Sequence, residues 1–81
     1  MKKLSPVILA DLVASKRKEK SMTQQALAEA TGINRALISR IEKQDFIPSI
    51  PQLEQLGEVL GFEPDSVFAD TAHDDAVLLR R

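Results

Sequence analysis

The stretch TQQALAEATGINRALISRI, residues 23–41, has the pattern of two short helices joined at a glycine. Thr23 can cap the first helix, because its hydroxyl can accept a hydrogen bond from the free backbone N–H groups that open a helix. Gly32 stands where that helix must stop and the chain must reverse, and glycine takes the left-handed conformation needed there without a Cβ penalty. Asn34 can cap the second helix as Thr23 caps the first. The stretch therefore predicts a closely hinged pair of helices.

The second of the two helices carries different chemistry on its two faces. Ile38 and Ile41 form an apolar stripe that is suited to a core. The opposite face carries Arg35, Ser39 and Arg40, which can all form hydrogen bonds. A short helix pair with such an outer face is the layout of a helix-turn-helix, whose second helix enters the major groove of DNA.

Several short motifs resemble those of Cro and lambda repressor, the XRE type of helix-turn-helix protein. The joint spacing of these residues is more specific than any one of the motifs. The similarity extends over roughly residues 6–68. It implies an all-α, five-helix, lambda-repressor-like fold in which helices 2 and 3 form the helix-turn-helix. The matching features are Thr23-Gln24, Ala28, Gly32, Ile38-Ser39-Arg40-Ile41-Glu42, Pro48-Ser49 and Leu60-Gly61.

The rest of the chain carries further helix signals. Ser5 and Pro6 suit the start of a first helix, because serine caps and proline loses no hydrogen bond at the first helical position. Ser49 and Gln52 are spaced as a capping box for a fourth helix. A short fifth helix is predicted over residues 63–68. No stretch alternates apolar and polar residues for long enough to predict a strand.

The length of 81 residues allows one small domain. We predict that residues 1–70 form the helix-turn-helix DNA-binding domain. Residues 71–81 then form a C-terminal tail that is either disordered or a short additional helix.

The charge of the chain is strongly polarised, although its net charge is only −1. Residues 1–44 hold nine basic and four acidic side chains, whereas residues 45–81 hold two basic and eight acidic ones. Such a chain can present a positive face to phosphate while its other face stays acidic. The distribution therefore favours a nucleic-acid partner, which the net charge alone does not.

The composition argues against several other classes of protein. The chain has no cysteine, which excludes disulfides and thiolate metal sites and fits a reducing cytoplasm. No apolar run approaches the roughly 18–20 residues that span a membrane. His73 stands alone among acidic neighbours, without the partners that a metal site needs. The sequence has no nucleophile–base pair and no Gly-rich phosphate loop, so we expect neither an enzyme nor a cofactor.

The candidate DNA contacts lie in and beside the helix pair. Arg35 and Arg40 are the candidates for reading bases, because the arginine fork matches guanine O6 and N7, although each could instead contact phosphate or solvent. Leu37 could touch thymine methyl groups or lean over the adjacent turn. Ala36 could touch a thymine methyl group or simply allow the helix to approach the DNA closely. The full set is Arg17, Thr23, Gln24, Asn34, Arg35, Ala36, Leu37, Ser39, Arg40 and Lys43.

The resemblance adds expectations for two of these residues, Arg17 and Gln24, and for Glu42 and Gln44. It supports a role for Gln24, at the start of the second helix, in gripping a phosphate oxygen. It implies that Arg17 pairs with Glu42 and so locks the first helix to the third; the alternative is two unrelated surface charges. Gln44 stands where the family often has glycine, so the exit from the recognition helix is expected to differ in detail.

We expect the protein to act as a dimer. One recognition helix covers too few base pairs for tight, selective binding, and proteins of this layout pair two copies on half-sites one DNA turn apart, roughly 34–36 Å. The predicted contact surface is C-terminal, although Val67 or Phe68 could instead belong to the core. The candidate interface residues are Val67, Phe68, Val77, Leu78 and Leu79.

These observations predict a sequence-specific, cytoplasmic DNA-binding transcriptional regulator, a repressor that binds a palindromic operator as a homodimer. The alternative is an antitoxin that represses its own operon and uses its acidic C-terminal half to bind a basic toxin. A third reading is a helical module that bridges proteins without binding DNA, and Gln24, Arg35 and Arg40 on one face argue against it.

Overall fold

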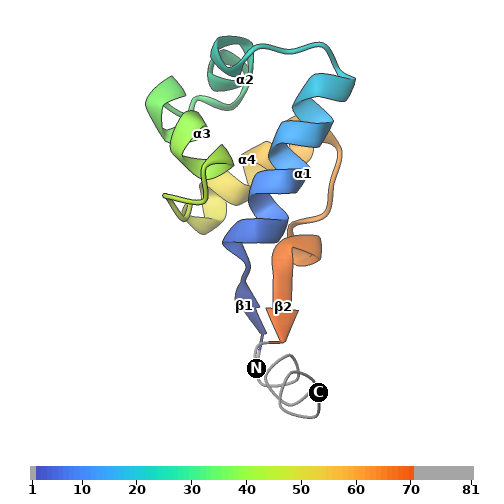
Figure 1. The fold of residues 1–81 in the computed structure, drawn as a ribbon. Coiled ribbons are helices and arrows are strands. Elements are labelled where there is room, and N and C mark those ends of the chain that lie inside the picture. The colour runs from blue at the N-terminus through green and yellow to red at the C-terminus, as the bar shows by residue number, and fades with distance from the viewer. Residues whose placement is uncertain (1, 71–81) are drawn as a thin grey trace.

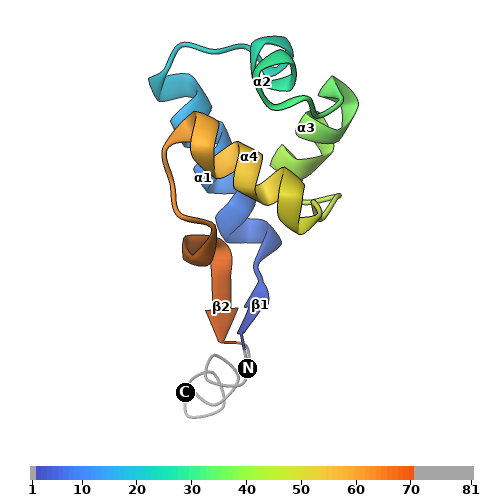
Figure 2. The same ribbon diagram turned by 180° about the vertical axis from the view of Figure 1, so that it is seen from behind.

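The computed structural model describes residues 2–70, which form four α-helices, one 3-10 turn and a two-stranded sheet (Figure 1). The helices α2 and α3 lie at one end of the molecule, and the sheet projects from the other end (Figure 2). None of the described helices is long and apolar enough to cross a membrane. The elements are β1 (Lys2–Leu4), α1 (Pro6–Glu19), α2 (Gln24–Thr31), α3 (Arg35–Glu42), α4 (Ile50–Leu60), η1 (Pro64–Val67) and β2 (Phe68–Asp70).

The helices begin at the caps that the sequence predicts. The side-chain oxygens of Ser5, Thr23 and Asn34 accept backbone N–H groups at the starts of α1, α2 and α3, at 3.2, 3.0 and 2.7 Å. The capping box of α4 is complete. Gln52 N–H donates to Ser49 Oγ at 3.3 Å, and Ser49 N–H donates to Gln52 Oε1 at 2.8 Å. Local chemistry therefore sets where each helix starts.

A single apolar core joins the four helices and η1. The two isoleucines predicted as the inner stripe of α3, Ile38 and Ile41, are almost completely buried in it. Their burial fixes which face of α3 points outward. The core residues are Leu9, Val13, Leu27, Ala28, Ile33, Ile38, Ile41, Leu53, Leu56, Leu60 and Val67.

The end of the described chain corrects the five-helix prediction. Residues 64–67 form a single 3-10 turn, and Phe68 already belongs to β2. The strand β2 pairs antiparallel with β1, with Leu4 opposite Phe68, and Ser5 N–H donates to the Val67 carbonyl at 2.8 Å. The predicted short fifth helix is therefore a 3-10 turn that ends at Val67, so the count of five α-helices is not confirmed, and the two short strands were not predicted. Strands of three residues are too short to show alternation, and this pair joins the two ends of the described chain.

The structure also corrects part of the predicted dimer interface. Val67 has no exposed surface and belongs to the core, so it cannot contact a second copy. Phe68 is half-buried and packs against the core, and its place in an interface stays a prediction. Val77, Leu78 and Leu79 lie outside the described residues, as does the whole tail 71–81.

Gly57 is a buried residue inside α4, where alanine would be the better helix former. The segment just after α4 approaches it closely: a Cβ at position 57 would lie 2.5 Å from the Phe62 carbonyl oxygen. We expect Gly57→Ala to lower the free energy of unfolding by about 1–2 kcal/mol, since this clash outweighs the helix preference of alanine. Urea denaturation followed by circular dichroism measures the change. The exposed Gln55→Ala in the same helix is the control, and a Gly57→Ala protein as stable as this control would contradict the packing argument.

Candidate nucleic-acid interface

The turn between α2 and α3 is fixed by one glycine and one buried hydroxyl. Gly32 has a φ of +75°, the left-handed conformation that its position requires. Thr31 Oγ1 donates to the Leu27 carbonyl at 2.8 Å and accepts a hydrogen bond from Ile33 N–H at 3.2 Å. These bonds hold α3 at a defined angle to α2. The role of Thr31 is not predictable from the sequence, because nothing in the pattern distinguishes a buried hydroxyl at a helix end from an exposed one.

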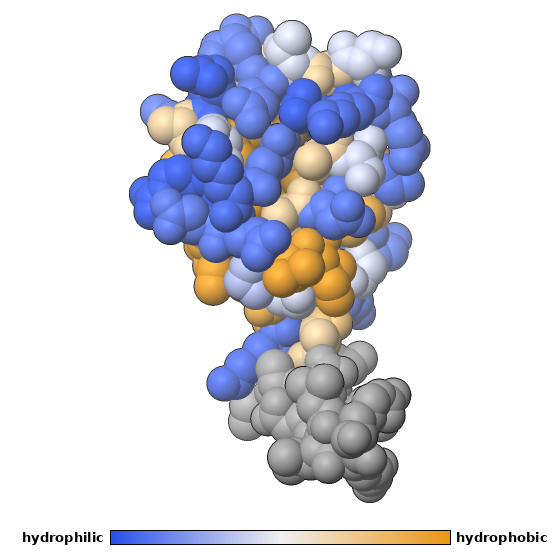
Figure 3. Space-filling model, viewed as in Figure 1, coloured by the Kyte–Doolittle hydropathy of each residue, from blue (hydrophilic) through white to orange (hydrophobic). Residues whose placement is uncertain are grey.

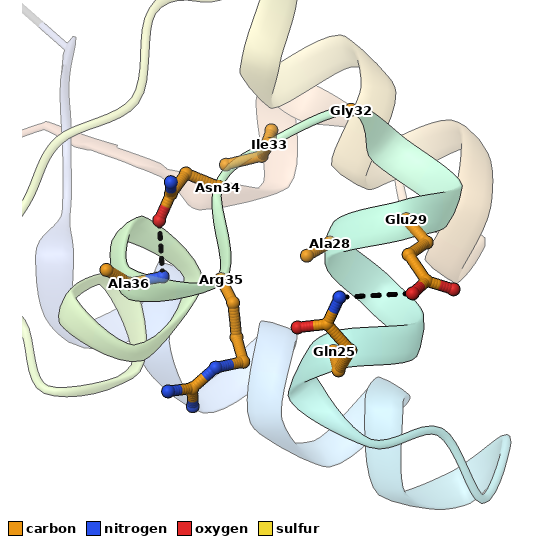
Figure 4. A pocket seen from close by; sticks show the side chains of 8 residues that line it. All are labelled: Gln25, Ala28, Glu29, Gly32, Ile33, Asn34, Arg35 and Ala36. Carbon is orange, nitrogen blue, oxygen red and sulfur yellow. Dashed lines mark hydrogen bonds between the residues drawn. The ribbon is translucent and has the colours of Figure 1, made fainter.

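An open cleft of about 620 Å³ lies between α2 and the start of α3 (Figure 4). On the α2 side, Gln25 Nε2 donates to Glu29 Oε2 at 3.0 Å. Arg35 extends from the first turn of α3, away from that pair. Within residues 2–70 its guanidinium has no hydrogen-bond or ion-pair partner. A cation with unused donors therefore stands at the first turn of α3.

The outer face of α3 carries most of the predicted DNA contacts. Arg35, Ala36 and Arg40 are exposed, and so is Lys43 at the C-cap. The N-caps Thr23 and Asn34 are exposed too. Ser39 is half-buried. Leu37 is half-buried and packs against the core, as expected for a leucine that leans over the adjacent turn. Its contact with thymine stays a prediction, as do the other DNA contacts.

The predicted lock between α1 and α3 is confirmed. Arg17 Nε donates to Glu42 Oε2 at 2.8 Å and Arg17 Nη2 to Glu42 Oε1 at 3.0 Å, a bidentate pair. Arg17 Nη1 also donates to the Met22 carbonyl at 2.8 Å, and Gln24 Nε2 donates to Glu42 Oε1 at 3.2 Å. The two side chains of the ion pair are only 13% and 11% exposed. One carboxylate therefore ties the end of α1, the start of α2 and the end of α3 together.

The environment of Arg17 favours its charged form. The hydrogen bond to Glu42 raises the pKa of Arg17 above its ordinary value, burial opposes this rise, and the negative charge of Glu42 adds to it. Since an arginine side chain is already protonated at any pH at which a protein is handled, the lock does not open through this group. Three of the Arg17 nitrogens are used within the protein, so its contact with DNA stays a prediction.

The exit from α3 is a tight turn in which Gln44 has a φ of +64°. Gln44 N–H donates to the Ile41 carbonyl at 3.0 Å and Asp45 N–H to the Arg40 carbonyl at 2.7 Å, the pattern of a Schellman motif. Gln44 thus adopts the conformation for which glycine is usually chosen. The side chain of Arg40 folds back onto this turn instead of extending over the outer face, and its contact with bases stays a prediction.

The distribution of polar side chains marks the same end of the molecule. Hydrophilic side chains cover most of the face that carries α2 and α3, and hydrophobic ones gather lower down, around the start of α1 (Figure 3). Val7 and Ile8, in the first turn of α1, are 60% and 39% exposed. The exposed cations of α3 therefore lie on a hydrophilic surface suited to a polar partner.

The sequence model of the helix-turn-helix family HTH_3 matches residues 13–67, more than half of the chain. The chain belongs to this family. It is a DNA-binding helix-turn-helix protein of transcription regulation, as the resemblance to the XRE type implied. A comparison with curated protein sequences finds no match.

Solved structures share the HTH_3 fold seen here. The restriction-modification controller protein C.AhdI from Aeromonas hydrophila has 24% identity and a TM-score of 0.70, over 78% of this chain and 96% of that one. An HTH_3 family transcriptional regulator from Vibrio cholerae has 22% identity and a TM-score of 0.68, over 76% of this chain and 35% of that one. A mutant of the restriction-modification controller protein C.Esp1396I has 24% identity and a TM-score of 0.67, over 99% of this chain and 94% of that one. At these identities the likeness establishes the fold alone.

Proposed function

We propose that this HTH_3 protein represses transcription by binding a palindromic operator as a dimer, with α3 of each copy in the major groove. The observation that carries the proposal is the outer face of α3, where exposed arginines stand on a helix that Arg17 and Glu42 lock in place. A recognition helix that is already fixed loses little conformational entropy when it binds, so more of the contact energy remains as affinity.

The proposed contacts divide into base reading and backbone binding. Arg35 is at the N-terminal end of α3, the part of a recognition helix that reaches base edges, and we assign it to guanine. Gln24 opens α2, where the helix N-terminus and the amide N–H that does not bond to Glu42 can hold a phosphate together. We assign Lys43, which is exposed at the C-cap of α3, to a second phosphate. Arg17 acts through Glu42 by holding α3.

The dimer is part of the proposal because a single α3 spans too few base pairs for selective binding. Phe68 and the segment 77–79 remain the candidate contact residues, with residues 1–70 as the DNA-binding domain. A modest two-fold contact, strengthened when both copies occupy one operator, is what this arrangement requires.

Selection of random duplexes by the purified full chain tests the proposal. We expect one palindrome to be enriched, with half-site centres roughly 34–36 Å apart, because a two-fold symmetric dimer binds a site of the same symmetry. Sedimentation of the complex should give two chains per duplex. Enrichment of a single asymmetric half-site bound by one chain would contradict the dimer, and no enrichment would contradict DNA binding.

The neighbouring genes distinguish the regulatory settings. Two solved proteins with this fold are restriction-modification controllers, and the chain covers nearly their whole length. A methyltransferase and endonuclease gene pair beside this gene would favour a controller of that kind. The antitoxin alternative rests on the acidic residues 45–81. An adjacent gene for a small basic toxin would favour it.

A further inference from the structure

The side chain of Arg40 is held by the loop that follows α3. Its Nε donates to Asp45 Oδ2 at 3.3 Å, and its Nη2 donates to the Asp45 carbonyl at 3.0 Å. The centre of the guanidinium lies 5.7 Å from the centroid of the Phe46 ring, within the range of a cation–π contact. Three separate groups of the loop thus compete with any outside partner for one cation.

The backbone of the turn puts Asp45 in this place. The left-handed φ of Gln44 and the hydrogen bond from Asp45 N–H to the Arg40 carbonyl reverse the chain, so that residue 45 returns beside the last turn of α3. A carboxylate therefore lies against the exposed guanidinium of Arg40. A DNA phosphate that approached this cation would meet the negative charge of Asp45.

Exposure decides how firmly Asp45 can hold Arg40. The two side chains are 52% and 71% exposed, in contrast to 13% and 11% for Arg17 and Glu42. Exposed pairs contribute little to stability, so the contact can open without cost to the fold. The pair is thus accessible to DNA and weak enough for a phosphate to displace the carboxylate.

We propose that Asp45 restrains DNA binding, because its carboxylate competes with a DNA phosphate for the guanidinium of Arg40. This inference rests on the proposed function. Arg40 lies in the last turn of α3, whereas the N-terminal residues of a recognition helix read base edges. Arg40 therefore contacts the DNA backbone in this proposal. The carboxylate of Asp45 then weakens binding to all duplexes alike.

Asp45→Asn tests the proposal. It removes the charge and leaves the backbone bonds of the turn in place. We expect it to tighten binding by about three- to ten-fold at low salt, both to the selected operator and to a scrambled duplex, since a phosphate contact carries no sequence information. The gain should shrink as salt is raised. Asp65→Asn is the matched control, because Asp65 is an exposed acid in η1, beside the sheet.

The double variant separates a specific competition from a general change in net charge. In an Arg40→Gln background, Asp45→Asn should tighten binding by less than about two-fold, because its target is gone. The proposal is overturned if Asp45→Asn does not tighten binding, if it tightens only the selected operator, if Asp65→Asn has the same effect, or if the full gain persists without Arg40. If the wild-type protein binds no duplex, the proposed function itself is overturned. If the wild type binds DNA but Asp45→Asn does not tighten binding, only the role of Asp45 is overturned.

Discussion

Glu42→Ala is expected to lower the free energy of unfolding by about 2–4 kcal/mol, a large part of the stability of a small domain. The variant removes a carboxylate that accepts three hydrogen bonds and leaves the mostly buried guanidinium of Arg17 without its ionic partner. Chemical denaturation followed by circular dichroism measures the loss.

The chain contains its own control for this prediction. Asp45 also pairs with an arginine, but both partners are largely exposed, so Asp45→Ala should cost only about 0–1 kcal/mol. Equal losses in the two variants would contradict the conclusion that Arg17 and Glu42 lock the helices.

Arg35→Ala is expected to weaken binding to the selected operator by about 1–3 kcal/mol and to relax base preference at one position in each half-site. The reason is that Arg35 is exposed at the first turn of α3 and has no partner among residues 2–70, so its donors are available to a guanine. Titration of duplexes carrying each base at that position measures the effect.

Lys43→Ala is the comparison for Arg35→Ala. A lysine that contacts phosphates reads no bases. Its loss should therefore weaken binding to all duplexes alike and reduce the salt slope by about one. An Arg35→Ala protein that keeps the wild-type base preference would contradict the role assigned to Arg35.

Much of the helical core and of the lock could be predicted from sequence, because the signals are local or are carried by the family resemblance. Thr23, Asn34 and Ser49 cap helices by contacts within three residues. Gly32 marks a backbone conformation that few other residues adopt. The Arg17–Glu42 pair joins distant residues and was implied by the resemblance, not by the charges themselves.

The features that sequence analysis missed depend on the path of the folded chain. The strand pair β1–β2 joins Leu4 to Phe68, and neither three-residue strand carries a pattern of its own. The contact of Arg40 with Asp45 depends on the left-handed turn at Gln44, a conformation that is not predicted for a glutamine. The close approach of the Phe62 carbonyl to Gly57 likewise depends on the path of the chain after α4.

The central claim is that the exposed face of α3 binds a specific duplex. Its most direct test is an equilibrium titration of the full chain with the selected operator and with a scrambled duplex of the same composition, at several salt concentrations. The operator should bind at least about a thousand-fold more tightly than the scrambled duplex. Both affinities should fall as salt rises, because basic side chains displace condensed counterions. Equal affinity for the two duplexes, or no binding to either, would contradict this claim.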